Sequence, residues 1–522
     1  MAMSFDALLE ALPPRLSDIP RSWAMRKPDA IALSEAGTAL SYKQLDDAVA
    51  ATVKALQERG VRPGDRLMIV AENCIAQVVL MFAAARMDAW AVNVNARLSP
   101  HEVDTLRDHS QPRRIVYTAR ASAEARAHAE RHGAEPFDVL APFGLAEGEE
   151  IAIGPMNAQC RPEPVDVDGR KQVAALIYTT GTTGQPKGVM LTHYNLLFIA
   201  CVSSFVRGVS PDDRVCGVLP LTHVFGLASV ALGTLFAGAR LYLASRYSPA
   251  SLVQALKEDG ITILQGVPAM YARLLEYDFG GWDPARSSLR FIYAGGAPLD
   301  PTLKKDVERL FGRNLHNGYG MTESSPTISQ TRIDAPREDT SVGFAIPGIE
   351  LRIVDDHGKD VADGEPGELW VRGPNVMKGY YREPELTAAA INPEGWLATG
   401  DVVRRDPDGA LFIVGRSKEV IIRSGFNVYP IEVEAALNAH PAVIQSAVVG
   451  CPAEGGNEEV VAFVELEPSS RRLDTAVLGA WLEQRLSPYK RPARIVVLDA
   501  LPAAATGKIL KGKLKQMAGP MQ

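Results

Sequence analysis

The residues best suited to chemistry stand together in one stretch, Tyr178–Val189. It holds four threonines, three glycines and one lysine between two apolar segments, Val173–Ile177 and Val189–Leu191. Glycines let the backbone turn its amides toward one point, and amides and hydroxyls that converge beside a lysine can hold a polyphosphate. We therefore predict a phosphate-binding loop here rather than a plain hairpin turn.

This stretch differs from the common phosphate loop, which carries Gly-Lys-Ser/Thr and leads into a helix. Here Pro186 precedes Lys187 and Gly188 follows it. Proline and glycine both disfavour a helix, so we expect the loop to connect two strands. The pattern argues against a P-loop kinase or GTPase and for another way of handling ATP.

Four residues further along the chain have the chemistry that ATP would need. Tyr319 stands between two glycines, which could leave its ring open for a purine to stack on. Glu323 could hold Mg²⁺, because one carboxylate plus substrate phosphates is a common magnesium site. Asp401 could accept two ribose hydroxyls, or could be an ordinary turn aspartate. Lys508 lies in a Thr-Gly-Lys segment near the C-terminus.

Length and composition narrow the class of protein. The 522 residues are too many for one ordinary core, so at least two domains are expected. Apolar residues at 46% and charged residues at 22% are typical of a soluble globular enzyme. The net charge of −7 with no strongly basic block makes nucleic acid an unsuitable partner.

The cysteines and apolar runs indicate the compartment. Five cysteines lie far apart without a Cys-x-x-Cys pair, which speaks against a zinc site or a disulfide framework. Met1–Leu12 lacks a basic segment and is not expected to be a secretory signal. The apolar run Gly226–Ala239 is shorter than the ~18 residues of a membrane span. We expect a cytoplasmic protein.

The first half of the chain alternates strand-like and helix-like segments. Ser41 is expected to cap a helix that runs to Glu58, and Ser99–Glu102 forms a capping box with proline at the first helical position. The region from Ala119 to Pro164 is expected to be a surface excursion. The alternation predicts a layered α/β fold. Ligands bind beyond the carboxyl ends of the strands in such sheets, here at Gly266–Pro268, Ala294–Pro298 and Asn317–Glu323.

From about Glu350 the character of the sequence changes. Short strands separated by Asp/Gly turns predict a small antiparallel or barrel-like piece. Beyond it, about 100 residues predict a small α+β domain. We place the boundaries at residues 1–415 for a large N-terminal domain, 416–419 for a hinge, and 420–522 for the C-terminal domain.

These features together resemble the adenylate-forming superfamily, which includes acyl-CoA synthetases, firefly luciferase and peptide-synthetase adenylation domains. The resemblance covers about Pro28 to Leu514 and is nearest to 4-coumarate–CoA ligase and the bacterial fatty-acyl and malonyl-CoA ligases. Six motifs occur in the order of the family: Tyr178–Val189, Pro220–Gly226, Asn317–Ser324, Gly395–Asp401, Gly415–Pro430 and Pro502–Lys508.

The resemblance implies a two-step reaction that uses ATP, CoA and Mg²⁺. A carboxylate attacks the α-phosphate of ATP to give acyl-AMP and pyrophosphate, and the CoA thiol then displaces AMP. It also implies a large domain of layered α/β subdomains with a small β-barrel-like piece, followed by a small mobile α+β domain. The ATP- and AMP-binding positions that it implies are Thr179, Thr180, Gly181, Thr182, Thr183, Gly184, Lys187, Gly296, Ala297, Pro298, Asn317, Gly318, Tyr319, Gly320, Thr322, Asp401 and Arg416.

By the same resemblance, Lys508 bridges the carboxylate and the α-phosphate during adenylation, and Glu323 binds Mg²⁺. Lys418 matches the hinge about which the C-terminal domain rotates, and Lys508 is a target for a lysine acetyltransferase and deacetylase. Gly425 lets the pantetheine of CoA approach. Ser424 stands where the plant ligases have a lysine, so any contact of that lysine with CoA is in doubt.

Two further sets of residues have two interpretations each. Arg423 and Lys490 could meet the phosphates of CoA or be ordinary surface charges. His223 matches a gate beside the acyl pocket and could equally be a core histidine. The pocket positions that the resemblance implies are His223, Val224, Phe225, Gly266, Val267, Ala294, Gly295, Gly320, Met321 and Ser325.

These pocket positions are mostly small and apolar, which favours a medium-chain or aromatic monocarboxylate. The alternative is a dicarboxylate such as malonate or oxalate, because the segment around Arg273 resembles malonyl-CoA ligases, in which an arginine meets the second carboxylate. Two other classes stay open. One is an adenylate-forming enzyme with a non-CoA acceptor, and the other is a catalytically silent nucleotide-binding relative.

Overall fold

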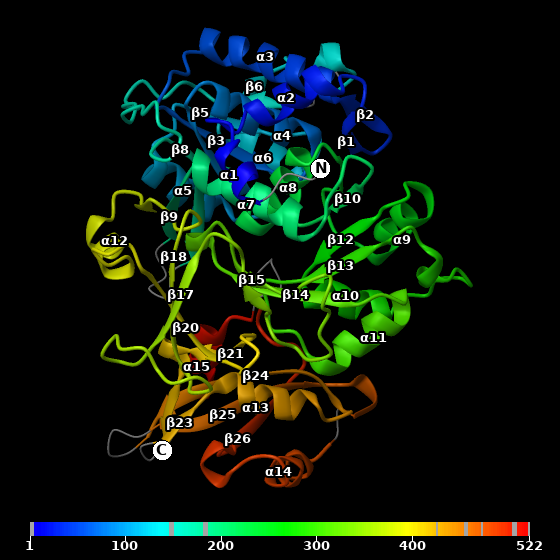
Figure 1. Cartoon of the computed structure of the whole chain (residues 1–522), viewed down its shortest axis with the longest axis vertical. Helices are drawn as coiled ribbons and strands as arrows, with labels where there is room; N and C mark the ends of the chain where they lie inside the picture. The colour runs from blue at the N-terminus through cyan, green and yellow to red at the C-terminus, as the bar shows by residue number, and fades with distance from the viewer. Residues whose placement is uncertain are drawn as a thin grey trace.

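A computed structural model of the chain describes residues 5–145, 151–180, 186–423, 426–453, 458–470, 473–503 and 509–519, with the backbone alone at 180, 426 and 427. Two large sheets, each covered by helices, build the first two thirds of the molecule (Figure 1). Smaller sheets follow toward the C-terminus. The layered α/β fold predicted from the alternation of segments is confirmed.

The first large sheet has eight strands and contains the predicted phosphate-loop hairpin. Its order is β19 (Gly379–Tyr380), β9 (Pro186–Thr192), β8 (Val173–Thr180), β4 (Trp90–Asn95), β3 (Arg66–Ala71), β5 (Arg114–Tyr117), β7 (Ala152–Ile153) and β6 (Glu135–Pro136).

The second large sheet has nine strands and a central parallel part. Its order is β16 (Phe344–Ala345), β15 (Thr327–Gln330), β14 (Leu315–Gly320), β13 (Phe291–Ala294), β12 (Ile263–Gly266), β10 (Arg214–Gly217), β11 (Arg240–Leu243), β1 (Ile31–Glu35) and β2 (Thr38–Ser41).

The alternation of side chains along the strands explains the layers. In β3, Leu67 and Ile69 join one core, whereas Met68 and Val70 join another on the opposite face. The first core contains side chains from both large sheets and from the helices between them. These inner helices are α4 (Ile75–Arg86), α7 (His193–Val206), the π-helix η2 (Phe225–Leu232) and α8 (Gly233–Phe236).

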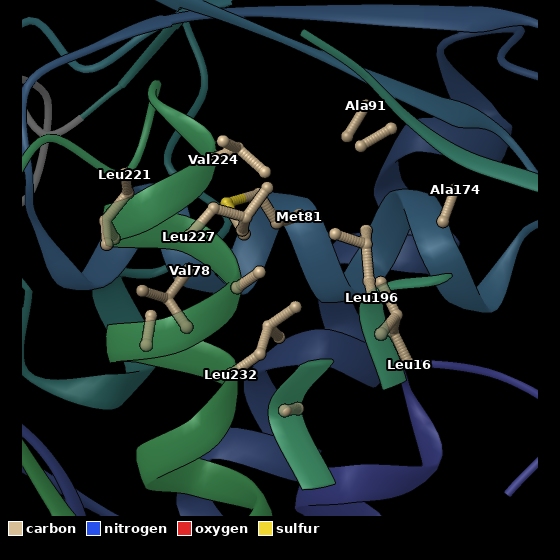
Figure 2. Close-up of a cluster of buried hydrophobic side chains, with 14 of the residues drawn as sticks. Leu16, Val78, Met81, Ala91, Ala174, Leu196, Leu221, Val224, Leu227 and Leu232 are labelled. Atoms are coloured by element: carbon tan, nitrogen blue, oxygen red, sulfur yellow. The ribbon is translucent and has the colours of Figure 1, made fainter. Parts of the chain in front are cut away.

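Figure 2 shows this shared core, in which Val78 and Met81 of α4 lie beside Leu227 of η2 and beside Val224, the residue directly before η2. The inner helix α4 is apolar on every side because it is enclosed, and its residues from Ile75 to Ala85 are all buried. The outer faces are covered by α9 (Pro249–Glu258), α10 (Pro268–Leu275) and α11 (Pro301–Phe311) on the nine-stranded sheet, and by α5 (Pro100–Ser110) and α6 (Ala123–Arg131) on the eight-stranded sheet.

Local capping signals predicted the helix starts well. Ser41 and Ser99 each form a complete capping box, at the start of α3 (Tyr42–Glu58) and of α5. The region from Ala119 to Pro164 was predicted wrongly as a surface excursion, since it contributes α6, β6 and β7. Strands of two residues carry no periodicity from which they could be recognised.

The remainder of the chain forms smaller units. An antiparallel sheet of four strands has the order β17 (Glu350–Val354), β18 (Gly367–Arg372), β20 (Leu397–Arg405) and β21 (Leu411–Arg416). A hairpin, β22 (Ile421–Arg423) and β23 (Phe426–Val428), follows. The C-terminal α+β unit contains β24 (Val443–Pro452), β25 (Glu458–Leu466), β26 (Arg494–Leu498), α13 (Pro430–Asn438), α14 (Thr475–Glu483) and α15 (Lys511–Ala518), and has cores of its own.

Three other helices complete the described chain: α1 (Phe5–Glu10), α2 (Asp18–Arg26) and α12 (Pro384–Ala390). Within the described residues, no helix combines the length and the apolar character that crossing a bilayer requires.

Gly226 of η2 packs against the backbone of Leu219 and Pro220, and a substitution at Gly226 tests how close this packing is. A β-carbon at Gly226 would lie 2.3 Å from the carbonyl oxygen of Pro220 and 2.7 Å from that of Leu219. Because backbone must shift to relieve these contacts, we expect Gly226→Ala to lower the free energy of unfolding by about 1–3 kcal/mol. Gly233→Ala on α8 is the matched control, because its β-carbon would meet Ser203 at an ordinary 3.4 Å. Urea unfolding of both variants measures the difference, and equal stabilities would contradict the prediction.

Candidate active site

The predicted phosphate loop connects two antiparallel strands, as expected from Pro186 and Gly188. Thr179 of β8 pairs with Lys187 of β9, and Thr180 pairs with Pro186. The strand-loop-strand prediction is therefore confirmed and a Walker-type helix does not follow the lysine. Gly181, Thr182, Thr183 and Gly184 lie outside the described residues.

Lys187 and Glu323 are connected through the side chain of Tyr380. The Lys187 ammonium lies 5.2 Å from the centroid of the Tyr380 ring, at cation–π distance. On the other side, the Tyr380 hydroxyl donates a hydrogen bond of 2.9 Å to Oε1 of Glu323. Tyr380 reaches this position because β19 pairs with β9, which places Tyr380 opposite Val189. Burial, together with the Glu323 carboxylate, raises the pKa of Tyr380 far above its usual range, so its hydroxyl remains a donor.

The environment of Glu323 fits a magnesium ligand. Glu323 lies in a 3₁₀ turn directly after β14 and is buried, with 9% of its surface exposed. Its backbone carbonyl accepts from the amide of Met377 at 2.9 Å, which fixes the turn. Among the described residues, only Tyr380 bonds to its carboxylate, through Oε1, so Oε2 is available. One such carboxylate oxygen beside the predicted phosphate loop is what Mg²⁺ held mainly by substrate phosphates requires.

Removing the Tyr380 hydroxyl tests this connection. We expect Tyr380→Phe to weaken divalent-metal binding about 10-fold, because a partner that orients a metal ligand is typically worth 10–100-fold in affinity. The phenylalanine ring keeps the cation–π contact with Lys187, so only the hydrogen bond is lost. Binding of Mn²⁺ in the presence of ATP, followed by electron paramagnetic resonance, measures the affinity without turnover.

Tyr381→Phe is the matched control for this experiment. The Tyr381 hydroxyl donates to Glu163 at 2.7 Å, away from Glu323. Unchanged Mn²⁺ affinity in the Tyr380 variant, or an equal loss in both variants, would contradict a specific role of the Tyr380 hydroxyl.

A second polar cluster joins residues that are far apart in the sequence. The hydroxyl of Tyr319, on β14, donates to Oδ2 of Asp401, and Arg416 pairs with Oδ1 of Asp401 at 3.1 Å. Asp401 and Arg416 are opposite one another in the β20–β21 pair. Burial and the Asp401 carboxylate raise the pKa of Tyr319 well above its usual range. The cluster thus presents an aromatic ring, a carboxylate and a cation at one place, as expected for a nucleoside site.

Glycines let the strand end around Tyr319 pack closely against its neighbours. A β-carbon at Gly320 would lie 1.9 Å from the carbonyl oxygen of Pro326, and one at Gly318 would lie 2.0 Å from the Tyr293 hydroxyl. Asn317 is held by backbone, because its amide donates to the carbonyls of residues 340 and 341 at 3.1 Å. The predicted adenine residues Gly296, Ala297 and Pro298 are exposed, and Thr322 is buried.

The predicted acyl-pocket residues fall into two environments. Val224 is completely buried in the shared core (Figure 2), and Gly266, Ala294, Gly295 and Phe225 are buried at the strand ends and on η2. Three residues are more accessible: Val267 and Met321 are half-buried, and His223 is exposed.

The alternative in which His223 is a core histidine is therefore wrong, because the ring lies at the surface. There it accepts a hydrogen bond of 3.3 Å from the amide of Phe225. Its role as a gate stays a prediction. Arg273, proposed from the malonyl-ligase alternative, is exposed in the last turn of α10.

Lys418 lies between two anchored residues. Before it, the Ser417 hydroxyl donates to the carbonyl of Gly400 at 3.0 Å, which ties Ser417 to β20. After it, Glu419 pairs with Lys511 of the C-terminal helix α15 at 3.0 Å, and Lys511 also pairs with Glu434 at 2.9 Å. Lys418 itself is exposed.

The predicted CoA residues are described in part. Ser424, Gly425 and the catalytic candidate Lys508 lie outside the described residues. Arg423 is held by the carbonyl of Arg491 at 2.7 Å and by Glu459 at 3.0 Å, and Lys490 pairs with Glu432. Both cations thus stabilise the C-terminal unit, which favours the interpretation as ordinary structural charge.

Sequence reasoning missed Tyr380. Its position in Gly379-Tyr-Tyr381 gives no catalytic signal, and Glu323 is 57 residues away. The strand β19 has two residues, so its pairing with the phosphate hairpin could be recognised only from the fold.

Comparisons with known proteins agree with this geometry. The family model described as AMP-binding enzyme matches residues 20–381, and the one described as AMP-binding enzyme C-terminal domain matches residues 432–508. The chain is 36% identical to a feruloyl-CoA synthase from Amycolatopsis sp over 95% of this chain and 99% of that protein. It is 31% identical to a long-chain-fatty-acid–CoA ligase from Bacillus subtilis (strain 168) over 96% and 94%, respectively.

A solved structure is similar over the whole length. O-succinylbenzoate coenzyme A synthetase (MenE) from Bacillus subtilis, in complex with ATP and magnesium ion, has a TM-score of 0.80 and 30% sequence identity. The similarity covers 95% of this chain and 99% of that chain. Both the order of the domains and the fold of this chain are thus those of a characterised group of structures.

Proposed function

The chain belongs to the AMP-binding enzyme family and is an AMP-forming acyl-CoA synthetase, and from this premise we propose that its substrate is a medium-chain or aromatic monocarboxylate. ATP and CoA are the co-substrates of the family. The proposal extends to the individual residues that carry out the two steps.

The reaction has two steps, which are connected by one intermediate, the acyl-adenylate. An oxygen of the carboxylate attacks the α-phosphorus of ATP, the bond to the β-phosphate oxygen breaks, and pyrophosphate leaves. The thiol of CoA then loses its proton to solvent as its sulfur attacks the acyl carbon, the bond to the phosphate oxygen breaks, and AMP leaves with the electron pair. Attack of one anion on another is slow until charge is neutralised, which is why cationic groups are needed in the first step.

The observation that carries the nucleotide assignment is the Asp401 carboxylate, which accepts from the Tyr319 hydroxyl and pairs with Arg416. We assign the adenine to the Tyr319 ring and the segment from Gly296 to Pro298, and the two ribose hydroxyls to the Asp401 carboxylate. Arg416, paired with Asp401 at 3.1 Å, orients that carboxylate. Thr322, at the next turn, is assigned to the α-phosphate.

The hairpin of β8 and β9 is assigned to the phosphates of ATP. We assign the β- and γ-phosphates to the loop from Thr179 to Lys187, and Mg²⁺ to Glu323, whose available oxygen supports this assignment. The similar synthetase from Bacillus subtilis contains ATP and a magnesium ion. When bound, Mg²⁺ would supply charge neutralisation at the phosphate oxygens.

Residues of the C-terminal domain are assigned to both steps, Lys508 to the first and Gly425 to the second. Lys508 neutralises charge during adenylation and then leaves, for which a compact and flexible side chain is suited. Rotation at Lys418 brings Gly425 to the acyl-adenylate, where the lack of a side chain leaves room for pantetheine. We propose residues 1–415, 416–419 and 420–522 as the N-terminal domain, the hinge and the C-terminal domain.

Two observations support the class of acid. The predicted pocket residues are mostly small and apolar: glycines, Ala294 and Val267 at the strand ends, and Phe225 on η2. The named relatives include a feruloyl-CoA synthase and a long-chain-fatty-acid–CoA ligase, one named for an aromatic acid and one for a fatty acid. The five cysteines are buried and none of them forms a disulfide within the described residues, which is in keeping with a cytoplasmic enzyme.

A panel of acids tests the proposal. The enzyme is supplied with ATP, Mg²⁺, CoA and one acid at a time, and AMP, pyrophosphate and the mass of the thioester are measured. We expect AMP and thioester with octanoate or cinnamate as substrate. Preference for malonate or oxalate would overturn the monocarboxylate assignment, and AMP without thioester would overturn CoA as the acceptor.

A further inference from the structure

The segment Pro374–Tyr381, which follows β18, is bonded to both large sheets beside the predicted ATP site, and we call it the 374–381 segment. It includes β19 and therefore carries Tyr380, whose hydroxyl donates to Glu323. The amides of residues 378 and 381 donate to the carbonyls of residues 190 and 188 of β9, at 3.0 and 2.8 Å. These bonds connect the segment to the eight-stranded sheet, on the strand that follows the predicted phosphate loop.

A second set of bonds connects the segment to the end of the nine-stranded sheet. The amide of Met377 donates to the carbonyl of Glu323 at 2.9 Å. The hydroxyl of Ser325 donates to the carbonyl of Asn375 at 2.8 Å, and the Asn375 side chain donates to the carbonyl of Thr327 on β15 at 3.1 Å. Met377, Ser325 and Asn375 are all buried. The 374–381 segment thus connects the turn that holds Glu323 with the hairpin of β8 and β9.

Asn195 holds the beginning of this segment. It lies in the first turn of α7, directly after β9, and is 6% exposed. Its Nδ2 donates to the carbonyl of Pro374 at 2.7 Å and to that of Val376 at 2.9 Å. Its Oδ1 accepts from the amide of Thr192 at 2.9 Å, as part of the capping box of α7. Both polar atoms of the side chain are therefore used, and both protons of its amide group are donated to the segment.

The two bonds from Nδ2 are not needed to cap the helix. The capping box requires only an oxygen that accepts from the amide of Thr192, which a carboxylate would supply equally well. The carbonyls of residues 374 and 376 lie directly before the amide of Met377, which bonds to Glu323. Without Asn195 the segment would stay paired with β9 through residues 378 and 381, but the part that supports the turn of Glu323 would lose its bonds to α7.

We propose that Asn195 is a positioning residue for the site of ATP and the divalent cation, and that it acts through the 374–381 segment to hold Glu323 at a fixed separation from the hairpin of β8 and β9. A cation that is bound by Glu323 and by the phosphates contacts both elements, so an error in their separation weakens its binding. This inference rests on the proposed function, because it assumes that Glu323 and this hairpin hold Mg²⁺ and the phosphates of ATP.

Asn195→Asp separates the two roles of the side chain. The aspartate keeps an oxygen that accepts from Thr192, but it replaces the two donors by an oxygen that repels the carbonyls of residues 374 and 376. We expect the affinity for Mn²⁺ in the presence of ATP to fall about 10–100-fold, the usual effect of losing a group that orients a metal ligand. Electron paramagnetic resonance measures this affinity without turnover, and an unchanged affinity would overturn the proposal.

Asn73→Asp is the matched control, because Asn73 has the same bonding pattern at another junction of the two sheets. It is buried after β3, where its Nδ2 donates to the carbonyls of Gly217 and Leu219 at 3.0 and 2.8 Å. Its Oδ1 accepts from the amide of Leu221 at 2.8 Å. These bonds hold the loop after β10 and do not involve the 374–381 segment, so the affinity for Mn²⁺ should stay at the wild-type value. An equal loss of affinity in both variants would overturn a specific role of Asn195.

The two half-reactions distinguish positioning from a general structural role. Asn195→Asp should lower pyrophosphate release with acid and ATP about 10–100-fold. Thioester formation from supplied acyl-AMP and CoA should stay close to the wild-type rate, because the second step uses no β- or γ-phosphate. Equal losses in the two half-reactions would assign Asn195 a structural role and overturn the inference.

A double variant tests whether Asn195 acts through the segment that carries Tyr380. Tyr380→Phe alone is expected to weaken Mn²⁺ binding about 10-fold. In the Asn195→Asp background the same change should weaken it by less than about 3-fold, because the segment no longer holds the Tyr380 hydroxyl at Glu323. Full effects of both substitutions in the double variant would overturn the action through the segment.

A second variant and a separate assay keep the outcomes distinct. If Asn195→Asp does not fold, Asn195→Ala removes the same donors without adding a charge, and its Mn²⁺ affinity and its double variant with Tyr380→Phe decide the question. Formation of AMP and a thioester from cinnamate or octanoate by the wild-type enzyme tests the proposed function independently of these affinities.

Discussion

Replacing Lys508 by alanine is expected to lower the rate of acyl-adenylate formation about 10²–10³-fold, the usual effect of removing one group that stabilises developing charge. The same variant should convert supplied acyl-AMP and CoA into thioester at close to the wild-type rate. The reason is that Lys508 is assigned to the first step alone, in which a carboxylate anion approaches a phosphate. Pyrophosphate release measures the first half-reaction, and thioester formation from synthetic acyl-AMP measures the second.

Gly425→Leu provides the complementary variant for this experiment. A leucine side chain would narrow the path of pantetheine, so thioester formation should fall while pyrophosphate release with acid and ATP is kept. Acetylation of Lys508 should reproduce the alanine phenotype, because it removes the same charge. Equal losses of both half-reactions in both variants would falsify the assignment of the two residues to separate steps.

Replacing Asp401 by asparagine is expected to have the second largest effect, a fall in kcat/KM for ATP of about 10²-fold. The substitution removes a charged acceptor, and a hydrogen bond to a charged group contributes about 1.5–3 kcal/mol. It also leaves Arg416, which pairs with Asp401 at 3.1 Å, without its carboxylate. Steady-state kinetics with ATP and with 2′-deoxy-ATP measures the loss.

The deoxy nucleotide makes the Asp401 experiment specific. If Asp401 binds the ribose, the variant should distinguish ATP from 2′-deoxy-ATP much less than the wild type does, because the acceptor of that hydroxyl is weakened. Asp408→Asn is a suitable control, since Asp408 pairs with Arg337 at the turn between β20 and β21. A variant at Asp401 that discriminates as strongly as the wild type would argue for a purely structural role.

Much of the fold could be predicted because its signals are local. The capping boxes at Ser41 and Ser99 and the apolar runs of β3 and β8 each occupy one continuous stretch. The strands β6, β7 and β19 could not be predicted, since each has two residues and exists only through pairing with distant strands. The enclosed position of α4 between the two sheets could also not be predicted from the alternation of strand-like and helix-like segments.

The candidate site, too, could be predicted only in part. Tyr319, Glu323, Asp401 and Arg416 were proposed from motifs, but the contacts that join Tyr319 to Asp401 across 82 residues required the fold. Tyr380 gave no signal at all, because its contact with Glu323 depends on the pairing of the two-residue strand β19 with β9. No local sequence pattern encodes a pairing between such distant segments.

The anchors around Lys418 would limit the rotation proposed for the C-terminal domain. Ser417 is held by Gly400 on one side, and Glu419 is held by Lys511 on the other. If both contacts persist during rotation, the change of orientation must be absorbed by the backbone torsion angles of a single residue and its immediate bonds. A hinge of this kind would have few intermediate orientations, unlike a flexible linker. The two reaction steps would then be separated by a discrete switch, which keeps the thiol of CoA away until the acyl-adenylate has formed.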